Sequence, residues 1–130
     1  MLYLYILITL KNILINYTKR YIKEIIKLKI YNKLVRDKIP QIIEKDNCNC
    51  KIHIASDLEY TKELEKKLME ETQEYITDKN LEELADIMEV ICALAENLGF
   101  TEKDLFNKRN EKNSLRGGFK DRIILEKTYK

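Results

Sequence analysis

Two pairs of acidic residues have a spacing that could hold a metal ion. Glu71 and Glu74 are three residues apart, and so are Glu83 and Asp86. Side chains at this spacing project from one face of a helix, so each pair presents two carboxylates in the same direction. Carboxylate oxygens are ligands that suit Mg²⁺ and Mn²⁺, and several carboxylates in a partly buried place need such a counter-charge. The spacing predicts a Mg²⁺ site with these four residues as ligands, and Mn²⁺ is an alternative ion.

Glu71 has apolar neighbours that predict an inward-facing carboxylate. Leu68 precedes it by three residues and Tyr75 follows it by four, which places all three on one helical face. The alternative to a metal site is an ordinary solvated helix face, because glutamate favours helices and is usually exposed there. A single acidic pair therefore says little about function. Two pairs on consecutive segments, with Lys67 one turn before Glu71, favour the metal site.

The carboxylate pairs lie on segments that have the sequence signals of helices. Each of three apolar stripes follows a capping-box pattern, in which a polar residue is followed three residues later by an acidic one. The three patterns are Ser56 with Glu59, Asn80 with Glu83, and Thr101 with Asp104. They predict helices over residues 57–76, 81–98 and 101–115. Because the link between the first two is short, we expect antiparallel neighbours whose carboxylate pairs face each other.

The segments around these helices predict smaller elements. Ile39, Ile42 and Ile43 form an apolar face after Asp37, a suitable capping residue, and this predicts one short helix. Alternation in residues 51–55 is typical of a strand, and the tail at residues 121–129 has similar character and could pair with it. The predicted fold class is therefore all-α, with an antiparallel helical core and short flanking strands.

Residues 1–30 differ in character from the rest of the chain. They carry a net charge of +5, which leaves −3 on residues 31–130. Their apolar run, residues 1–10, is shorter than the roughly 20 residues that span a bilayer, and it lacks the basic start of a signal peptide. Three interpretations stay open: an amphipathic helix on a membrane or a partner, a packing extension, or a lead-in outside the native domain. We take residues 31–130 as the domain.

Composition bounds the class of protein. With 130 residues, 45% of them hydrophobic and 35% charged, the chain suits one folded domain. The acidic balance of residues 31–130 argues against nucleic-acid binding. Three cysteines without a secretory cleavage pattern indicate a reducing compartment, and we expect the cytoplasm. Cys48, Cys50 and His53 offer three zinc ligands where a structural site uses four, so an outward-facing His53 is favoured over zinc.

The acidic motif and three longer stretches resemble a known enzyme superfamily. The stretches are ExxE at residues 71–74 with ExxD at 83–86, YNKLVRDKIPQIIEKD, LEELADIMEVICALAENLG and RGGFKDRIILEK. Together they span about residues 31–127, where the chain is similar to the all-α nucleoside triphosphate pyrophosphohydrolases, of the MazG-like and phosphoribosyl-ATP pyrophosphohydrolase-like type. The resemblance implies Mg²⁺-dependent cleavage between the α- and β-phosphates of a nucleoside triphosphate, which gives a monophosphate and pyrophosphate, often in a house-cleaning role.

The same resemblance assigns roles to residues of the acidic motif. It implies that Glu71, Glu74, Glu83 and Asp86 are the metal ligands and that Lys67 contacts phosphate. Metal ions that bridge polyphosphate oxygens can orient a water and neutralise developing charge, and an adjacent carboxylate can help to activate that water. We therefore take Glu71, Glu74 and Lys67 as the candidate catalytic residues.

Basic residues outside the acidic motif are candidates for binding the triphosphate or the base. They are Lys33, Arg36, Arg109, Lys112 and Arg116. Any one of them could instead be ordinary surface charge. Arg116 is the strongest candidate, because the two glycines that follow it would allow the backbone to approach a ligand closely.

The helix expected over residues 81–98 is apolar around much of its circumference. Such a helix must be covered on several sides, and we expect a second copy of the chain to supply that cover, with a homodimer as the basic unit. Two alternatives to the triphosphate pyrophosphohydrolase remain. One is a phosphoribosyl-ATP pyrophosphohydrolase, and the other is a non-enzymatic helical module that oligomerises through this helix.

Overall fold

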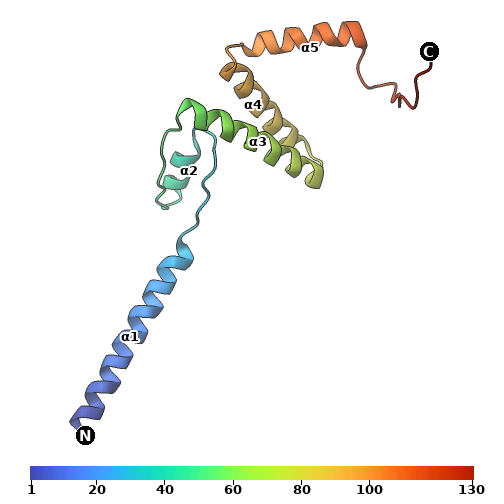
Figure 1. Ribbon diagram of the computed structural model, residues 1–130. Coiled ribbons are helices and arrows are strands. Elements are labelled where there is room, and N and C mark those ends of the chain that lie inside the picture. The colour runs from blue at the N-terminus through green and yellow to red at the C-terminus, as the bar shows by residue number, and fades with distance from the viewer. The chain divides into compact units, whose positions relative to one another are not determined.

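The computed structural model describes the backbone of residues 1–130 and every side chain except those of residues 26 and 27. Over this described backbone the chain forms five helices and no strand (Figure 1). The helices are α1 (Leu2–Lys27), α2 (Ile39–Lys45), α3 (Asp57–Asp78), α4 (Leu81–Asn97) and α5 (Glu102–Arg116). The predicted all-α class is confirmed. The chain divides into two units, Met1–Asn32 and Lys33–Lys130, and α1 is the helix of the first.

α1 is a long helix whose apolar side chains are exposed over the part that the structure describes. Leu14 and Tyr17 keep 71% and 76% of their surface exposed. The hydroxyl of Thr9 donates to the carbonyl of Tyr5 at 2.8 Å, and Arg20 pairs with Glu24 one turn away. Among the described residues, no helix combines the length and apolar character that a bilayer crossing requires.

α3 and α4 form an antiparallel hairpin in the second unit. One hydrogen bond gives the direction of the two helices: the side-chain amide of Asn97, at the end of α4, donates to the hydroxyl of Thr61, near the start of α3, at 2.9 Å. Lys79 joins the other ends with a left-handed backbone (φ 48°, ψ 47°), and Asn80 begins α4. This short turn is the connection that the sequence predicted, so the two carboxylate-bearing helices are neighbours.

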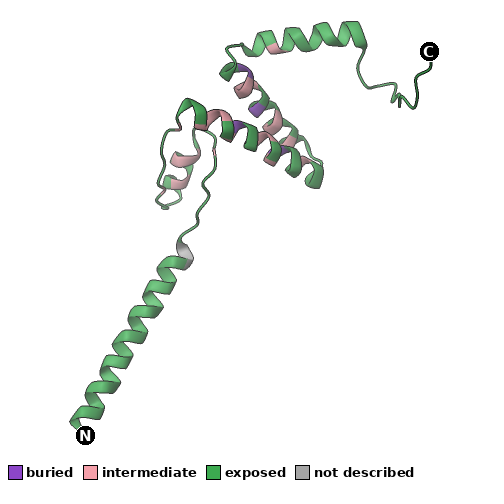
Figure 2. Cartoon of the chain, in the orientation of Figure 1, coloured by how far each residue is buried: buried purple, intermediate pink, exposed green. Residues whose placement is uncertain are grey.

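The buried residues lie on this hairpin. Leu64 on α3 and Val90 and Ala95 on α4 form the apolar part, and the fourth buried residue is Glu71. Figure 2 shows the buried class on α3 and α4 only, while α2 and α5 carry none. A core of three small or medium apolar side chains is modest for a unit of this length.

α2 and α5 follow their sequence signals in different degrees. α5 begins with a full capping box, in which the Thr101 hydroxyl accepts from the Asp104 N–H and the Asp104 carboxylate accepts from the Thr101 N–H. Its final N–H group, at Gly117, bonds to the Asn113 carbonyl. α2 begins after Lys38 with no side-chain cap, so the prediction that Asp37 caps this helix is wrong.

The predicted flanking strands are absent from the described backbone. Residues 51–55 and 121–129 have no strand hydrogen bonds, and their apolar side chains are exposed, with Ile54 at 89% and Ile123 at 82%. A strand needs a neighbour that supplies the other half of its hydrogen-bond ladder, and a short alternating stretch does not provide one by itself. The prediction of short strands was wrong for this reason.

Candidate metal centre

Glu71 is the buried charged residue on which the candidate centre is built. Only 4% of its surface is exposed, and it is the one buried charged residue among the side chains that the structure describes. Its position on α3 follows from the apolar stripe, because it lies two turns beyond the buried Leu64. Its Oε1 lies 2.6 Å from Nζ of Lys67 on the preceding turn. The prediction that Glu71 faces inward is confirmed.

Two overlapping groups of carboxylates meet at Glu71. Glu70, Glu71 and Glu74 come from α3 alone, whereas Glu71, Glu83 and Asp86 combine α3 with α4. In each group, one carboxylate oxygen per residue lies within 4.8 Å of those of the other two. The hairpin thus brings the two predicted carboxylate pairs together. We call these five residues the acidic cluster.

One carboxylate oxygen of Glu83 is buried without a hydrogen-bond partner. Its backbone N–H bonds to Asn80 Oδ1 at 2.9 Å, which caps α4, but its side chain does not return to the Asn80 backbone as a full capping box would require. Its carboxylate joins the acidic cluster, where Oε2 is buried without a hydrogen-bond partner. A buried carboxylate oxygen without a partner is costly, and a bound cation would satisfy it. The residues present therefore fit a divalent cation.

Crowding of the carboxylates affects the protonation of Glu74. Although Glu74 is exposed, neighbouring atoms displace part of the water around its carboxylate and raise its pKa; the charge and hydrogen bond of Glu71, followed by the charges of Glu70 and Glu83, raise this pKa further. This is the expected behaviour of like charges that share a site. The raised pKa means that the cluster favours a positive charge next to Glu74, either a proton or a cation.

Lys67 is a cation within the cluster. Its Nζ lies 3.1 Å from Oε1 of Glu70 and 2.6 Å from Oε1 of Glu71. Burial lowers the pKa of Lys67, but the hydrogen bonds and the charges of Glu71 and Glu70 together outweigh this effect, so that the net shift of the pKa is upward. Lys67 therefore stays protonated and anchored at the cluster.

Two more cations reach the cluster from the segment before α2. Lys33 Nζ lies 2.7 Å from Glu70 Oε1, and this hydrogen bond is the main reason that the pKa of Glu70 is lowered. Arg36 Nη2 lies 2.5 Å from Asp86 Oδ1, and Nη1 lies 3.8 Å from Glu89 Oε2. The five carboxylates of the acidic cluster thus meet three cations, and one of these, Arg36, also pairs with Glu89. Carboxylates therefore outnumber cations at the cluster, which favours the binding of a further positive charge.

The other three basic candidates lie elsewhere in the second unit. Arg109, Lys112 and Arg116 are exposed residues of α5, and none of them pairs with the acidic cluster in the described structure. Arg109 bonds instead to its neighbour Asn110 at 2.9 Å. Gly117 has φ 78° and ends α5, which gives this glycine a structural reason that needs no ligand. Binding of substrate by these three residues stays a prediction.

Two functional candidates were missed by sequence reasoning. Glu70 completes one carboxylate group and bonds to both Lys33 and Lys67, and Glu89 pairs with Arg36. The signal for Glu89 was present, since it follows Asp86 by three residues and so shares its helical face. A signal for Glu70 was present too, since Lys67 precedes it by three residues and Glu74 follows it by four, whereas its bond to the distant Lys33 could not be read from local spacing.

The zinc alternative gains nothing from the described side chains. Cys48 and Cys50 are free thiols, and they are not among the residues grouped closely enough to hold a metal. His53 Nε2 lies 2.9 Å from Glu59 Oε1, and the ring is largely exposed, as expected for an outward-facing residue. This contact also engages the Glu59 carboxylate, which would otherwise complete the capping box with Ser56.

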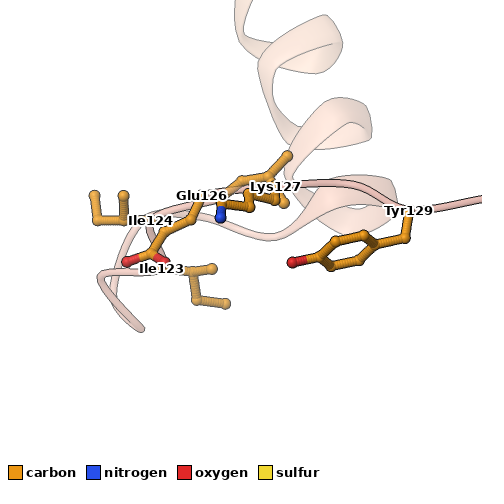
Figure 3. Close-up of a pocket in the computed structure, with 6 residues that line it drawn as sticks. Ile123, Ile124, Glu126, Lys127 and Tyr129 are labelled. Atoms are coloured by element: carbon orange, nitrogen blue, oxygen red, sulfur yellow. The ribbon is translucent and has the colours of Figure 1, made fainter.

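Two hollows of the described surface lie outside the acidic cluster, one beside it and one in the C-terminal tail. The one drawn in Figure 3, of about 420 Å³, is lined only by the exposed tail at residues 123–127 and 129, and it gathers no group of carboxylates. A groove of about 340 Å³ between α4 and α5 includes Glu89, Glu96 and Glu102. Three carboxylates in its wall make that groove unsuited to phosphate.

Comparison with known proteins adds no assignment to this geometry. No protein-family model matches the chain, and neither a curated protein nor a solved structure matches it.

Proposed function

We propose that the chain is a Mg²⁺-dependent nucleoside triphosphate pyrophosphohydrolase, which cleaves between the α- and β-phosphates to give a nucleoside monophosphate and pyrophosphate. The observation that carries the proposal is the acidic cluster around Glu71, with an unpartnered Glu83 oxygen and more carboxylates than cations. The sequence motifs that resemble the all-α pyrophosphohydrolases supply the reaction. An ordinary solvated acidic face does not explain why a carboxylate is the most buried polar group.

The carboxylates of the acidic cluster would hold the cation. Glu71, Glu83 and Asp86 come from both helices and offer oxygen ligands to one ion, and Glu74 with Glu70 forms the adjoining group. When bound, a divalent cation, Mg²⁺ or alternatively Mn²⁺, supplies positive charge to the phosphate oxygens and lowers the barrier to in-line displacement. The hairpin itself fixes the spacing of the ligands, because the turn at Lys79 and the side-chain cap of Asn80 hold the end of α3 next to the start of α4.

Glu74 is the residue best suited to take up the proton of the attacking water. Its side chain is exposed, unlike that of Glu71, so a water molecule can reach it at the edge of the acidic cluster. Lys67 is protonated and lies next to Glu71, where it can bind a phosphate oxygen. Lys33 and Arg36 can neutralise more of the polyphosphate charge from the other side of the cluster.

The identity of the nucleotide is a separate question, with phosphoribosyl-ATP as the alternative substrate. A screen for pyrophosphate release over canonical and damaged nucleoside triphosphates and phosphoribosyl-ATP, with and without Mg²⁺ or Mn²⁺, tests the reaction and the substrate together. We expect release to require the cation. Absence of release from every nucleotide in the presence of both ions would contradict the proposed function.

A homodimer belongs to the proposal because of the exposed apolar face of α4. Leu84, Met88 and Ile91 are exposed on this helix although the sequence predicts that they should be covered. The same face is the specific support for the rival function, a non-enzymatic module that oligomerises through α4. Sedimentation of the full chain distinguishes monomer from dimer, and the double variant Glu83→Gln with Asp86→Asn distinguishes the two functions, because a module would be unaffected by it.

A further inference from the structure

The segment at residues 33–36 supplies two of the three cations at the acidic cluster. Lys33 bonds to Glu70 and Arg36 bonds to Asp86, although these partners are 37 and 50 residues away in the sequence. Lys67, the third cation, belongs to α3 and lies on the same helix as the glutamates that it contacts. The segment therefore brings two positive charges to a cluster whose carboxylates all lie on α3 and α4.

Arg36 occupies an acceptor that the proposed cation would use. Its Nη2 lies 2.5 Å from Oδ1 of Asp86, and Asp86 shares a ligand group with Glu71 and Glu83. A guanidinium carries one positive charge and donates hydrogen bonds, so it can neutralise Asp86 but cannot satisfy the whole group as a divalent ion would. Glu83 Oε2, in the same group, remains without a partner while Arg36 is bound to Asp86.

The contact of Arg36 is also placed so that it can be exchanged. The Arg36 side chain is 52% exposed and that of Asp86 is 38% exposed, whereas the Lys67 and Glu71 side chains are 18% and 6% exposed. Half-exposed ion pairs contribute little and reorganise readily, because water can replace either partner. A guanidinium released from a carboxylate is well suited to bind phosphate, whose oxygens accept the same two-pronged hydrogen bonds.

We propose that Arg36 is a displaceable counter-ion, which binds Asp86 in the cation-free protein, yields Asp86 to the divalent cation, and then binds the polyphosphate of the substrate. The inference rests on the proposed function, since it assigns the order in which that site fills. When no substrate is present, Arg36 competes with the cation for Asp86. When the polyphosphate is bound, Arg36 and the cation both bind it. Removal of the charge of Arg36 should therefore strengthen the binding of the cation alone and weaken the binding of the polyphosphate.

The test is a pair of calorimetric titrations of the full chain and of the Arg36→Gln variant. In the first, Mg²⁺ or Mn²⁺ is added alone. We expect the variant to bind the ion about 3- to 10-fold more tightly, because the competing charge is gone. In the second, inorganic tripolyphosphate is added at saturating Mg²⁺, and we expect the variant to bind about 10-fold more weakly.

Two further variants control for net charge and for folding. Arg20→Gln removes the same charge from an exposed pair with Glu24 in the first unit and should alter neither titration. Arg36→Lys retains the charge without the planar guanidinium and should bind Mg²⁺ with nearly the wild-type affinity. Circular dichroism of each variant shows whether its helices are intact.

Each outcome separates this inference from the proposed function. A wild-type chain that binds neither ion overturns both. If the wild-type chain binds Mg²⁺ and Arg36→Gln binds it equally or more weakly, the displacement is wrong although the metal centre stands. Tighter Mg²⁺ binding with unchanged tripolyphosphate binding would also overturn the inference, because Arg36 would then be a counter-ion with no part in phosphate recognition.

Discussion

α1 and the α3–α4 hairpin make opposite use of their side chains. α1 has 26 residues, most of them apolar, and its described side chains are exposed. The hairpin buries four residues, and one of the four is Glu71. Hydrophobicity therefore does not decide which residues of this chain are buried. Apolar residues are buried only where a second helix packs against them. The carboxylate of Glu71 is buried where Lys67 forms an ion pair with it.

The largest effect should follow when the carboxylates of α4 lose their charge. Replacing Glu83 by Gln and Asp86 by Asn keeps the shape of both side chains but removes two ligands of the proposed cation. Loss of groups that merely orient metal ligands costs 10- to 100-fold, so loss of the ligands themselves should reduce pyrophosphate release by at least about 100-fold. The rate of release at saturating Mg²⁺ is the measurement.

Removal of residues 1–30 tests whether the region that contains α1 contributes to the reaction. The carboxylates and cations of the acidic cluster all lie in the second unit, so we expect the truncated chain to retain release within about twofold. A loss in the truncated chain as large as that in the double variant would mean that the first unit contributes to the site.

The next effect concerns stability and compares two leucines. Leu64 on α3 is 3% exposed, and Leu64→Ala should lower the free energy of unfolding by about 2–4 kcal/mol through lost burial and a cavity. Leu14 on α1 is 71% exposed, and Leu14→Ala should change the free energy of unfolding by less than about 0.5 kcal/mol. Urea unfolding followed by circular dichroism measures both. Equal losses would show that α1 is buried against something in solution.

The smallest effect should come from the cap of α5. The hydrogen bonds from the Thr101 hydroxyl and N–H lower the pKa of Asp104. A carboxyl whose pKa is lower in the folded state stabilises that state at pH values above its unfolded pKa, and the benefit is lost as the pH falls through the lowered value. We expect the helix content of the wild-type chain to decrease on acidification over this range by slightly more than that of Asp104→Asn. Identical acid titrations would contradict the role of this cap.

The sequence predicted the helical core well because local signals and tertiary packing agree there. Ser56, Asn80 and Thr101 each cap the helix that their position indicated, and the helix ends lie within two residues of the expected ones. The inward position of Glu71 followed from its spacing to Leu68 and Tyr75. These features depend on neighbours within one or two turns, which is the range over which a sequence pattern is informative.

The features that the sequence did not predict depend on distant partners. The side chains of Glu59 and Glu83 leave their capping boxes, one for His53 and the other for the acidic cluster, and a pattern of four residues does not contain either alternative. The link between Lys33 and Glu70 spans 37 residues. Residues 51–55 alternate as a strand would, but a strand also requires a partner, which no local pattern specifies.

The most direct test of the metal centre is the effect of Mg²⁺ on the melting temperature of the wild-type chain and of Glu71→Gln. An ion at ten times its dissociation constant stabilises the native state by about 1.4 kcal/mol, which is on the order of 5 °C for a domain of this size. We expect this shift for the wild-type chain and for the control Glu65→Gln, an exposed residue of the same helix. We expect no shift, and no pyrophosphate release, for Glu71→Gln. If Glu71→Gln retains both the shift and the release, Glu71 does not bind the metal and the proposed metal centre is wrong.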